Sequence, residues 1–128
     1  MDLRLRPSQR IRKQYFFQAI TRKGRLVKGE WLRVWVYDRA KLSEQPLARP
    51  QFGIIVSRKT AARATDRNLW KRRIREAFRK HQHEVRLEKV VLIQSGLKSV
   101  IPSYAAVESD LMRLLQEGGA LKKEAEAT

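Results

Sequence analysis

Residues 64–80, which read ATDRNLWKRRIREAFRK, restrict the fold more than any other stretch. Apolar side chains recur there at the spacings i, i+4, i+7 and i+8, which fall on one stripe of a helix with about 3.6 residues per turn. The stripe consists of Trp70, Ile74, Ala77 and Phe78. Such a stripe is stable only when it packs against another element. The stretch therefore predicts a helix that covers one side of a hydrophobic core.

A row of cations lies beside this stripe on the same helix. Arg67, Lys71 and Arg75 repeat at i, i+4 and i+8. Asn68 and Arg72 continue the arc outward. Like charges four residues apart destabilise an isolated helix by a few tenths of a kcal/mol per pair, so helix stability does not explain the row. A polyanionic partner does.

The charge of the whole chain supports the same interpretation. The formal net charge is +16 at pH 7. Residues 1–30 carry nine Lys and Arg against two acids, and residues 58–80 carry ten against two. An excess of this size favours nucleic acid as the partner, with an anionic membrane surface a distant second. We expect the two basic segments to lie near one another and to form one binding surface.

Length and composition set further limits. At 128 residues the chain is long enough for one modest core. It has no cysteine, which excludes disulfides and thiolate metal sites. No apolar stretch approaches the roughly 18 residues of a membrane-spanning helix, and no apolar targeting segment is evident. We expect a soluble cytoplasmic protein with no membrane partner.

The other elements follow from periodicity and from turn residues. Helices are predicted from Ser8 to Gly24, from Thr65 or Asp66 as N-cap to about Gln82, and from Ser103 to Gly118. Strands are predicted at residues 31–37, 52–57 and 90–93, and residues 24–30 and 94–101 are expected to be loops. This order favours an α+β sandwich. We expect residues 1–119 to form a single RNA-binding domain and residues 120–128 a disordered tail.

Aromatic residues have more than one possible role. In residues 31–37 the aliphatic side chains alternate with Trp31, Arg33, Trp35 and Tyr37, so one face of the strand is aromatic and basic. Tyr15, Phe16 and Phe17 point in three successive directions around a helix, so at least one ring should leave the core. Such rings either pack under a neighbouring element or stack on unpaired bases.

No catalytic constellation is evident in the sequence. There is no convincing carboxylate pair, no Ser/His/Asp arrangement and no glycine-rich phosphate loop. His81 and His83 would diverge at a helix end, and no cysteine or carboxylate cluster completes a metal site. We therefore predict no catalytic residue and no metal ligand, and a reactive centre outside this chain.

Several of these motifs resemble those of a known family. Residues 52–59 (FGIIVSRK), followed by Arg67-Asn68, Lys71-Arg72 and residues 75–78 (REAF), are similar to the protein component of bacterial ribonuclease P. The resemblance implies three helices on a small mixed sheet, an α-β-β-β-α-β-α sandwich with a left-handed crossover, of the ribosomal protein S5 domain 2-like type. It also implies that the RNA subunit hydrolyses precursor tRNA to release the 5′ leader, with Mg²⁺ bound mainly by the RNA.

The resemblance also implies a set of binding residues. Arg67, Asn68, Lys71, Arg72 and Arg75 match the basic helical motif and would bind RNA. Phe17 and Trp35 match aromatic positions of a leader cleft. From the charge pattern we add Arg33 to the cleft and Arg58 and Lys59 to the RNA-binding set. The implied partners are ribonuclease P RNA and precursor tRNA.

Three positions depart from the family pattern. Leu69 stands where the helical motif has arginine, which removes one expected contact but leaves the row of cations intact. Thr21 stands where a second cleft aromatic is usual, so stacking shifts to Phe17 and Trp35. Residues 94–96 (QSG) replace a basic residue and proline.

The leading hypothesis is a protein subunit of ribonuclease P that binds the catalytic RNA and the leader and thereby promotes endonucleolytic removal of the leader. A ribosome-associated RNA-binding protein without a catalytic role is the alternative. A DNA-binding module is less consistent with the sequence, because the basic helix has few side chains suited to base edges. A free-standing metal nuclease lacks the carboxylate cluster that it would need.

Overall fold

The computed structural model describes residues 3–42, 48–96 and 100–122. Its main elements are α1 (Gln14–Lys23), β1 (Arg25–Lys28), β2 (Leu32–Asp38), β3 (Gln51–Ile55), α2 (Ala64–His81), β4 (Lys89–Ser95) and α3 (Tyr104–Glu117). Short 3₁₀ turns occupy η1 (Pro7–Gln9), η2 (Arg39–Lys41) and η3 (Gln82–Glu84). The order α-β-β-β-α-β-α, which the family resemblance implies, is confirmed.

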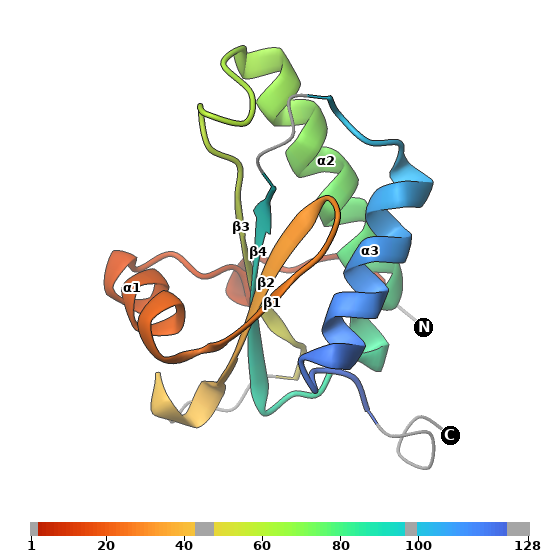
Figure 1. Ribbon diagram of the computed structural model, residues 1–128. Coiled ribbons are helices and arrows are strands. Elements are labelled where there is room, and N and C mark those ends of the chain that lie inside the picture. The colour runs from red at the N-terminus through yellow and green to blue at the C-terminus, as the bar shows by residue number, and fades with distance from the viewer. Residues whose placement is uncertain (1–2, 43–47, 97–99, 123–128) are drawn as a thin grey trace.

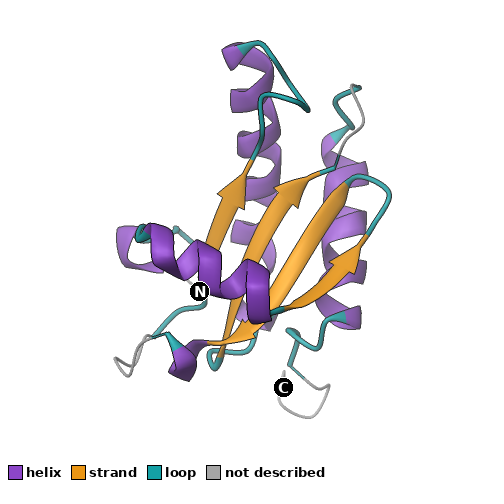
Figure 2. Ribbon diagram, turned by 60° about the vertical axis from the view of Figure 1, so that its left-hand side comes forward, coloured by secondary structure: helices purple, strands orange, loops and turns teal. Residues whose placement is uncertain are grey.

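The four strands form one mixed sheet in the order β1-β2-β4-β3. β2 pairs antiparallel with both β1 and β4, whereas β3 and β4 are parallel. Parallel neighbours need a crossover connection, and α2 provides it. α1 covers one face of the sheet and α2 and α3 cover the other (Figures 1 and 2). The left-handed sense of the crossover stays a prediction.

The larger core lies between the sheet and the pair α2 and α3. The predicted stripe of α2 is fully buried there, and Phe78 stacks on Phe52 of β3 with ring centroids 4.4 Å apart. The aliphatic residues of β2, which are Leu32, Val34 and Val36, face the same core. The helix predicted from residues 64–80 therefore takes the role that its periodicity predicts.

A smaller core lies between α1 and the opposite face of the sheet. Ile20 of α1 is fully buried against Trp35 and Tyr37 of β2, each of which is only 9% exposed. Phe16 and Phe17 pack at its border. The aromatic face of β2 is thus covered by a helix. Of the two roles considered for Trp35 and Tyr37, the structure shows packing under a neighbouring element.

The first helix begins later than predicted. Ser8 lies in η1 and caps no α-helix, and α1 starts at Gln14. Between them the chain is extended, because the Ile11 N–H donates to the Phe52 carbonyl at 2.9 Å and Arg10 forms a parallel bridge with Phe52. This pairing with the edge of the sheet takes residues 10–11 out of the helix. The predicted end at Gly24 is confirmed.

Two other local predictions were wrong. Residues 25–28 form β1 and pair with β2, whereas residues 24–30 were expected to be a loop. A short, largely exposed edge strand has no hydrophobic alternation to reveal it. At the start of α2, the N-cap position belongs to Arg63 and no side chain caps the helix, so neither Thr65 nor Asp66 has the predicted role.

The end of the chain is ordered further than predicted. Ser103 caps α3 by accepting from the Ala106 N–H at 3.2 Å, and the helix ends before Gly118, as predicted. Ala120, the first residue of the predicted tail, is buried, and its carbonyl accepts from the Arg86 N–H at 2.8 Å. The tail boundary was therefore placed too early. Residues 123–128 lie outside the described residues.

None of the helices in the described part of the chain has the length and apolar character that crossing a membrane requires.

Candidate nucleic-acid interface

The chain before α1 runs along the open edge of β3. Gln9 and Ile11 point inward and are 1% and 6% exposed, whereas Arg10 and Arg12 point outward. The Gln9 side chain donates to the Pro50 carbonyl at 2.9 Å and to Gln82 Oε1 at 3.1 Å. These contacts hold the segment against β3 and the end of α2, with two arginines presented to the surface.

A cleft of about 470 Å³ lies between this segment, α1 and α2, with β3 as its floor. We call it the β3 cleft. It is lined by Arg10, Ile11, Arg12, Phe17, Phe52, Gly53, Ile54, Lys71 and Arg75. The lining joins the two basic segments of the sequence. Their predicted proximity is therefore confirmed.

Phe17 and Gly53 shape the apolar side of the β3 cleft. Phe17 is half-buried on α1. A Cβ atom at Gly53 would lie 3.0 Å from Phe17 Cε1 and 3.1 Å from Leu92 Cδ1. The ring therefore lies against strand backbone that carries no side chain, which is the usual reason for glycine inside a strand where another group approaches closely.

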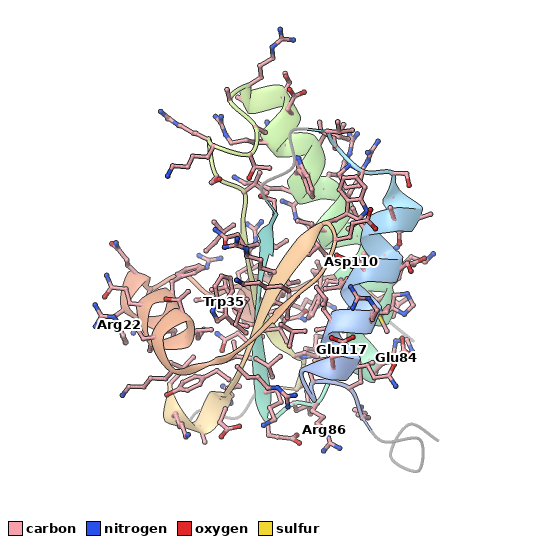
Figure 3. The ribbon with its side chains drawn as sticks, viewed as in Figure 1. Arg22, Trp35, Glu84, Arg86, Asp110 and Glu117 are labelled. Carbon is pink, nitrogen blue, oxygen red and sulfur yellow. The ribbon has the colours of Figure 1, made fainter. Side chains whose placement is uncertain are left out.

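Trp35 and Arg33 do not line the β3 cleft. Trp35 lies between α1 and the sheet (Figure 3), buried in the smaller core. Arg33 pairs with Gln94 of β4 and is half-exposed on the same strand as Trp35. The strand order explains the difference, because β4 separates β2 from β3. The structure therefore does not bring Trp35 and Arg33 into the β3 cleft with Phe17, and the leader-binding role of these three residues stays a prediction.

A second hollow, of about 420 Å³, lies on α2 itself. We call it the α2 hollow, and it is lined by Thr65, Asn68, Leu69, Lys71, Arg72 and Arg75. Four of the five residues predicted from the helical motif thus share one surface depression. Lys71 and Arg75 border both the α2 hollow and the β3 cleft. Leu69 lines the hollow where the family motif has arginine.

The remaining predicted RNA-binding residues lie at the start of α2. Arg67 Nη1 donates to the carbonyls of Ala61 and Ala62 at 3.0 and 2.7 Å, so this side chain also holds the preceding turn. Arg58 and Lys59 are exposed in that turn and line neither depression. The structure therefore groups Lys71, Arg72 and Arg75 closely and sets Arg58, Lys59 and Arg67 apart.

The cations of the two depressions lack carboxylate partners in the part of the chain that the structure describes. Among residues 3–42, 48–96 and 100–122, no ion pair involves Arg10, Arg12, Lys71, Arg72 or Arg75. Arg75 Nε is buried and has no hydrogen-bond partner among the same residues. A buried donor without an acceptor is costly, so an acceptor supplied by a ligand would stabilise this arrangement. A phosphate oxygen is suited to that role.

Sequence reasoning missed three residues of this site. Arg10 and Arg12 were assigned to a helix, although their alternation with Gln9 and Ile11 is the period-two pattern of an extended segment. Gly53 was treated only as part of an apolar strand. A glycine within such a strand was the signal available for a close approach.

The two histidines form no metal site with the described residues. His81 Nδ1 lies 2.5 Å from Glu84 Oε2, and its Nε2 lies 3.0 Å from Glu108 Oε2. The described part of the chain holds no group of three or more His, Cys, Asp or Glu side chains arranged to bind a metal ion. His81 instead links α2 to α3.

Comparison with known proteins decides the family. The family model described as Ribonuclease P matches residues 5–118. The chain belongs to the ribonuclease P protein family. Membership confirms the predicted role as the protein subunit of a ribonucleoprotein endoribonuclease, and it does not favour a ribosome-associated protein without a catalytic role.

Ribonuclease P proteins from several bacteria are similar to this chain over most of its length. The ribonuclease P protein component of Vesicomyosocius okutanii is 28% identical over 117 residues, which are 91% of this chain and 96% of the relative. That of Nitrosomonas eutropha is 34% identical over 115 residues, 89% of this chain and 84% of the relative. The RNase P protein structure from Staphylococcus aureus has a TM-score of 0.75 at 25% identity and covers 89% of this chain and 98% of its own. The Thermotoga maritima structure, at 24% identity and a TM-score of 0.69, shares the fold.

Proposed function

We propose that the chain binds ribonuclease P RNA through the α2 hollow and the 5′ leader of precursor tRNA through the β3 cleft. The observation that carries this proposal is the β3 cleft itself. It combines the half-buried ring of Phe17 with four cations that have no ion-pair partner within the described residues. Single-stranded nucleic acid is bound by this combination, because bases stack on aromatic rings while cations follow the backbone.

The residues divide into two groups under this proposal. Asn68, Lys71, Arg72 and Arg75 contact phosphates of the structured RNA, with Arg58, Lys59 and Arg67 at the edge of that surface. Phe17 stacks on a leader base above Gly53. Lys71 and Arg75 line both depressions, so they bring leader and catalytic RNA close together and neutralise part of their mutual repulsion.

The hydrolytic step belongs to the RNA subunit in this proposal. The RNA would hold most of the Mg²⁺, and this Mg²⁺ would supply the activation of the nucleophile and the stabilisation of the leaving oxygen. The protein binds and orients the substrate, and none of its side chains acts on the scissile phosphate. We propose that it does so in the cytoplasm, with ribonuclease P RNA and precursor tRNA as its partners.

Reconstitution with a cognate ribonuclease P RNA at low Mg²⁺ tests the proposal. The wild-type chain should stimulate cleavage and should bind precursor tRNA more tightly than mature tRNA. Phe17→Ala should weaken precursor binding by about 1–3 kcal/mol, the range for one stacked base, which is roughly 5- to 150-fold. Mature tRNA should bind this variant as it binds the wild type.

Tyr15→Ala is the matched control. Tyr15 lies two residues from Phe17 on the same helix, is 57% exposed and does not line the β3 cleft. Its removal should leave the preference for precursor tRNA unchanged. Equal wild-type affinities for precursor and mature tRNA would remove the leader-binding role, and a lack of stimulation would contradict the subunit role.

A further inference from the structure

A third depression adjoins the β3 cleft on the side of the N-terminal segment. It has a volume of about 410 Å³ and is lined by Leu5, Arg6, Pro7, Arg10, Arg12, Phe52 and Arg75. We call it the arginine lobe. Four of its lining residues, which are Arg10, Arg12, Phe52 and Arg75, also line the β3 cleft. A strand that leaves the cleft across Arg10 and Arg12 therefore enters the arginine lobe directly.

The lining of the arginine lobe is suited to phosphate and not to a base. Four arginines and no acidic side chain line it. Its one aromatic residue, Phe52, is 1% exposed and already stacks on Phe78, so no ring face is available to a base. Guanidinium groups bind phosphate oxygens through paired hydrogen bonds.

The backbone that carries these arginines is fixed before any RNA binds. Gln9 accepts from the Arg6 N–H at 2.8 Å and donates to the Pro50 carbonyl, which fixes η1 against the protein. The Ile11 N–H donates to the Phe52 carbonyl at 2.9 Å and fixes the extended residues that follow η1. The main chain is therefore already in place when RNA binds, which reduces the entropic cost of binding.

We propose that the arginine lobe is a second phosphate-binding site for the leader, occupied by the backbone of nucleotides upstream of the base that stacks on Phe17. This proposal rests on the proposed function of the β3 cleft. The lining residues favour the leader over the catalytic RNA, because the lobe shares four residues with the cleft but only Arg75 with the α2 hollow. The ligand is thus the phosphodiester backbone of a single strand.

A leader-length series with the holoenzyme tests the site. Precursor tRNAs whose leaders grow one nucleotide at a time should gain affinity for the wild type in two stages, first as the cleft fills and then as the lobe fills. The double variant Arg6→Gln/Arg10→Gln should lose the second stage, a loss of roughly 5- to 30-fold for long leaders. Its salt dependence should fall by about 0.7 per lost phosphate contact. Arg6→Gln alone, which changes no residue of the β3 cleft, should lose part of the same stage.

Neutral linkages in the leader identify the contact directly. A methylphosphonate that replaces the phosphate bound in the lobe should weaken wild-type binding but not weaken binding to Arg6→Gln/Arg10→Gln further, because the two changes remove the same interaction. Arg22→Gln removes one positive charge and is the control matched in charge to Arg6→Gln alone. Arg22 is exposed on α1, points away from the sheet (Figure 3) and should leave every leader length unchanged.

The outcomes separate this site from the function on which it rests. If the wild type binds precursor and mature tRNA equally, the β3 cleft has no leader role and the lobe proposal is overturned with it. If the wild type prefers precursor tRNA but the double variant matches it at every leader length, only the lobe proposal is overturned. The same holds if the variant loses affinity equally for mature tRNA or for ribonuclease P RNA alone, since the bound phosphates are then not those of the leader.

Discussion

The first part of α2, from Arg67 to Arg75, and its last part, from Glu76 to His81, both carry many cations but differ in what surrounds them. In the first part, Lys71, Arg72 and Arg75 border the β3 cleft or the α2 hollow and form no ion pair with the described residues. In the last part, Arg79 is bonded to Glu76 at 2.9 and 2.5 Å, and Lys80 lies 3.7 Å from Glu108.

The cations of α3, like those of the last part of α2, have carboxylate partners. On α3, Arg113 forms ion pairs with Asp110 and Glu117, with N···O distances of 3.0 Å each. The carboxylates of α3 therefore neutralise cations of their own helix and of the last part of α2. The net charge indicates a polyanionic partner, and we propose that the cations without carboxylate partners mark the surface that binds it.

The largest expected effect comes from removing the cations of α2 that lack carboxylate partners, compared with removing paired cations. Lys71→Gln/Arg75→Gln should weaken binding of ribonuclease P RNA by about 2–3 kcal/mol, roughly 30- to 150-fold, and reduce its salt dependence. Arg79→Gln/Arg113→Gln removes the same formal charge and should change RNA affinity little. Filter binding across a salt series measures both. Equal losses in the two double variants would show that only total charge matters.

Local periodicity correctly predicted the features that are set within a single helix or strand. Trp70, Ile74 and Phe78 of α2 are buried as a stripe because the 3.6-residue repeat fixes their common side whatever the rest of the chain does. The same holds for the aliphatic face of β2. The cap of α3 was predictable because Ser103 bonds to an amide only three residues away.

What sequence reasoning missed depends on contacts between distant residues. The segment before α1 is extended because Ile11 bonds to Phe52, a contact that local propensity does not contain. Phe17 and Trp35 were assigned to one cleft from the family resemblance. Alternation in residues 31–37 shows that the strand has two faces, but not which element covers each. Only the strand order, with β4 between β2 and β3, separates them.

A smaller effect is expected on the cleft side from Gly53→Ala. The added Cβ would lie 3.0 Å from Phe17 Cε1 and 3.2 Å from Ile11 Cδ1, so the Phe17 ring must shift by a few tenths of an ångström. We expect precursor tRNA affinity to fall by up to about tenfold, or 1.4 kcal/mol, with mature tRNA unaffected. In a Phe17→Ala background the same substitution should have almost no effect, because the ring that it displaces is absent. A full effect in that background would show that Gly53 acts on the leader without Phe17.

The smallest effect is expected at the paired end of α2, and it concerns stability instead of RNA binding. Burial alone lowers the pKa of His81, but its bonds to Glu84 and Glu108 outweigh burial and raise that pKa above its ordinary value of 6.5. The stabilisation by the imidazolium is therefore complete below about pH 6.5 and is lost as the pH rises through the raised pKa. Thermal unfolding midpoints of the wild type should fall over this range more steeply than those of His81→Gln, while both proteins bind RNA alike. Parallel midpoints would mean that the carboxylates do not hold a proton on His81, and a change in RNA affinity would mean that this end of α2 also contacts RNA.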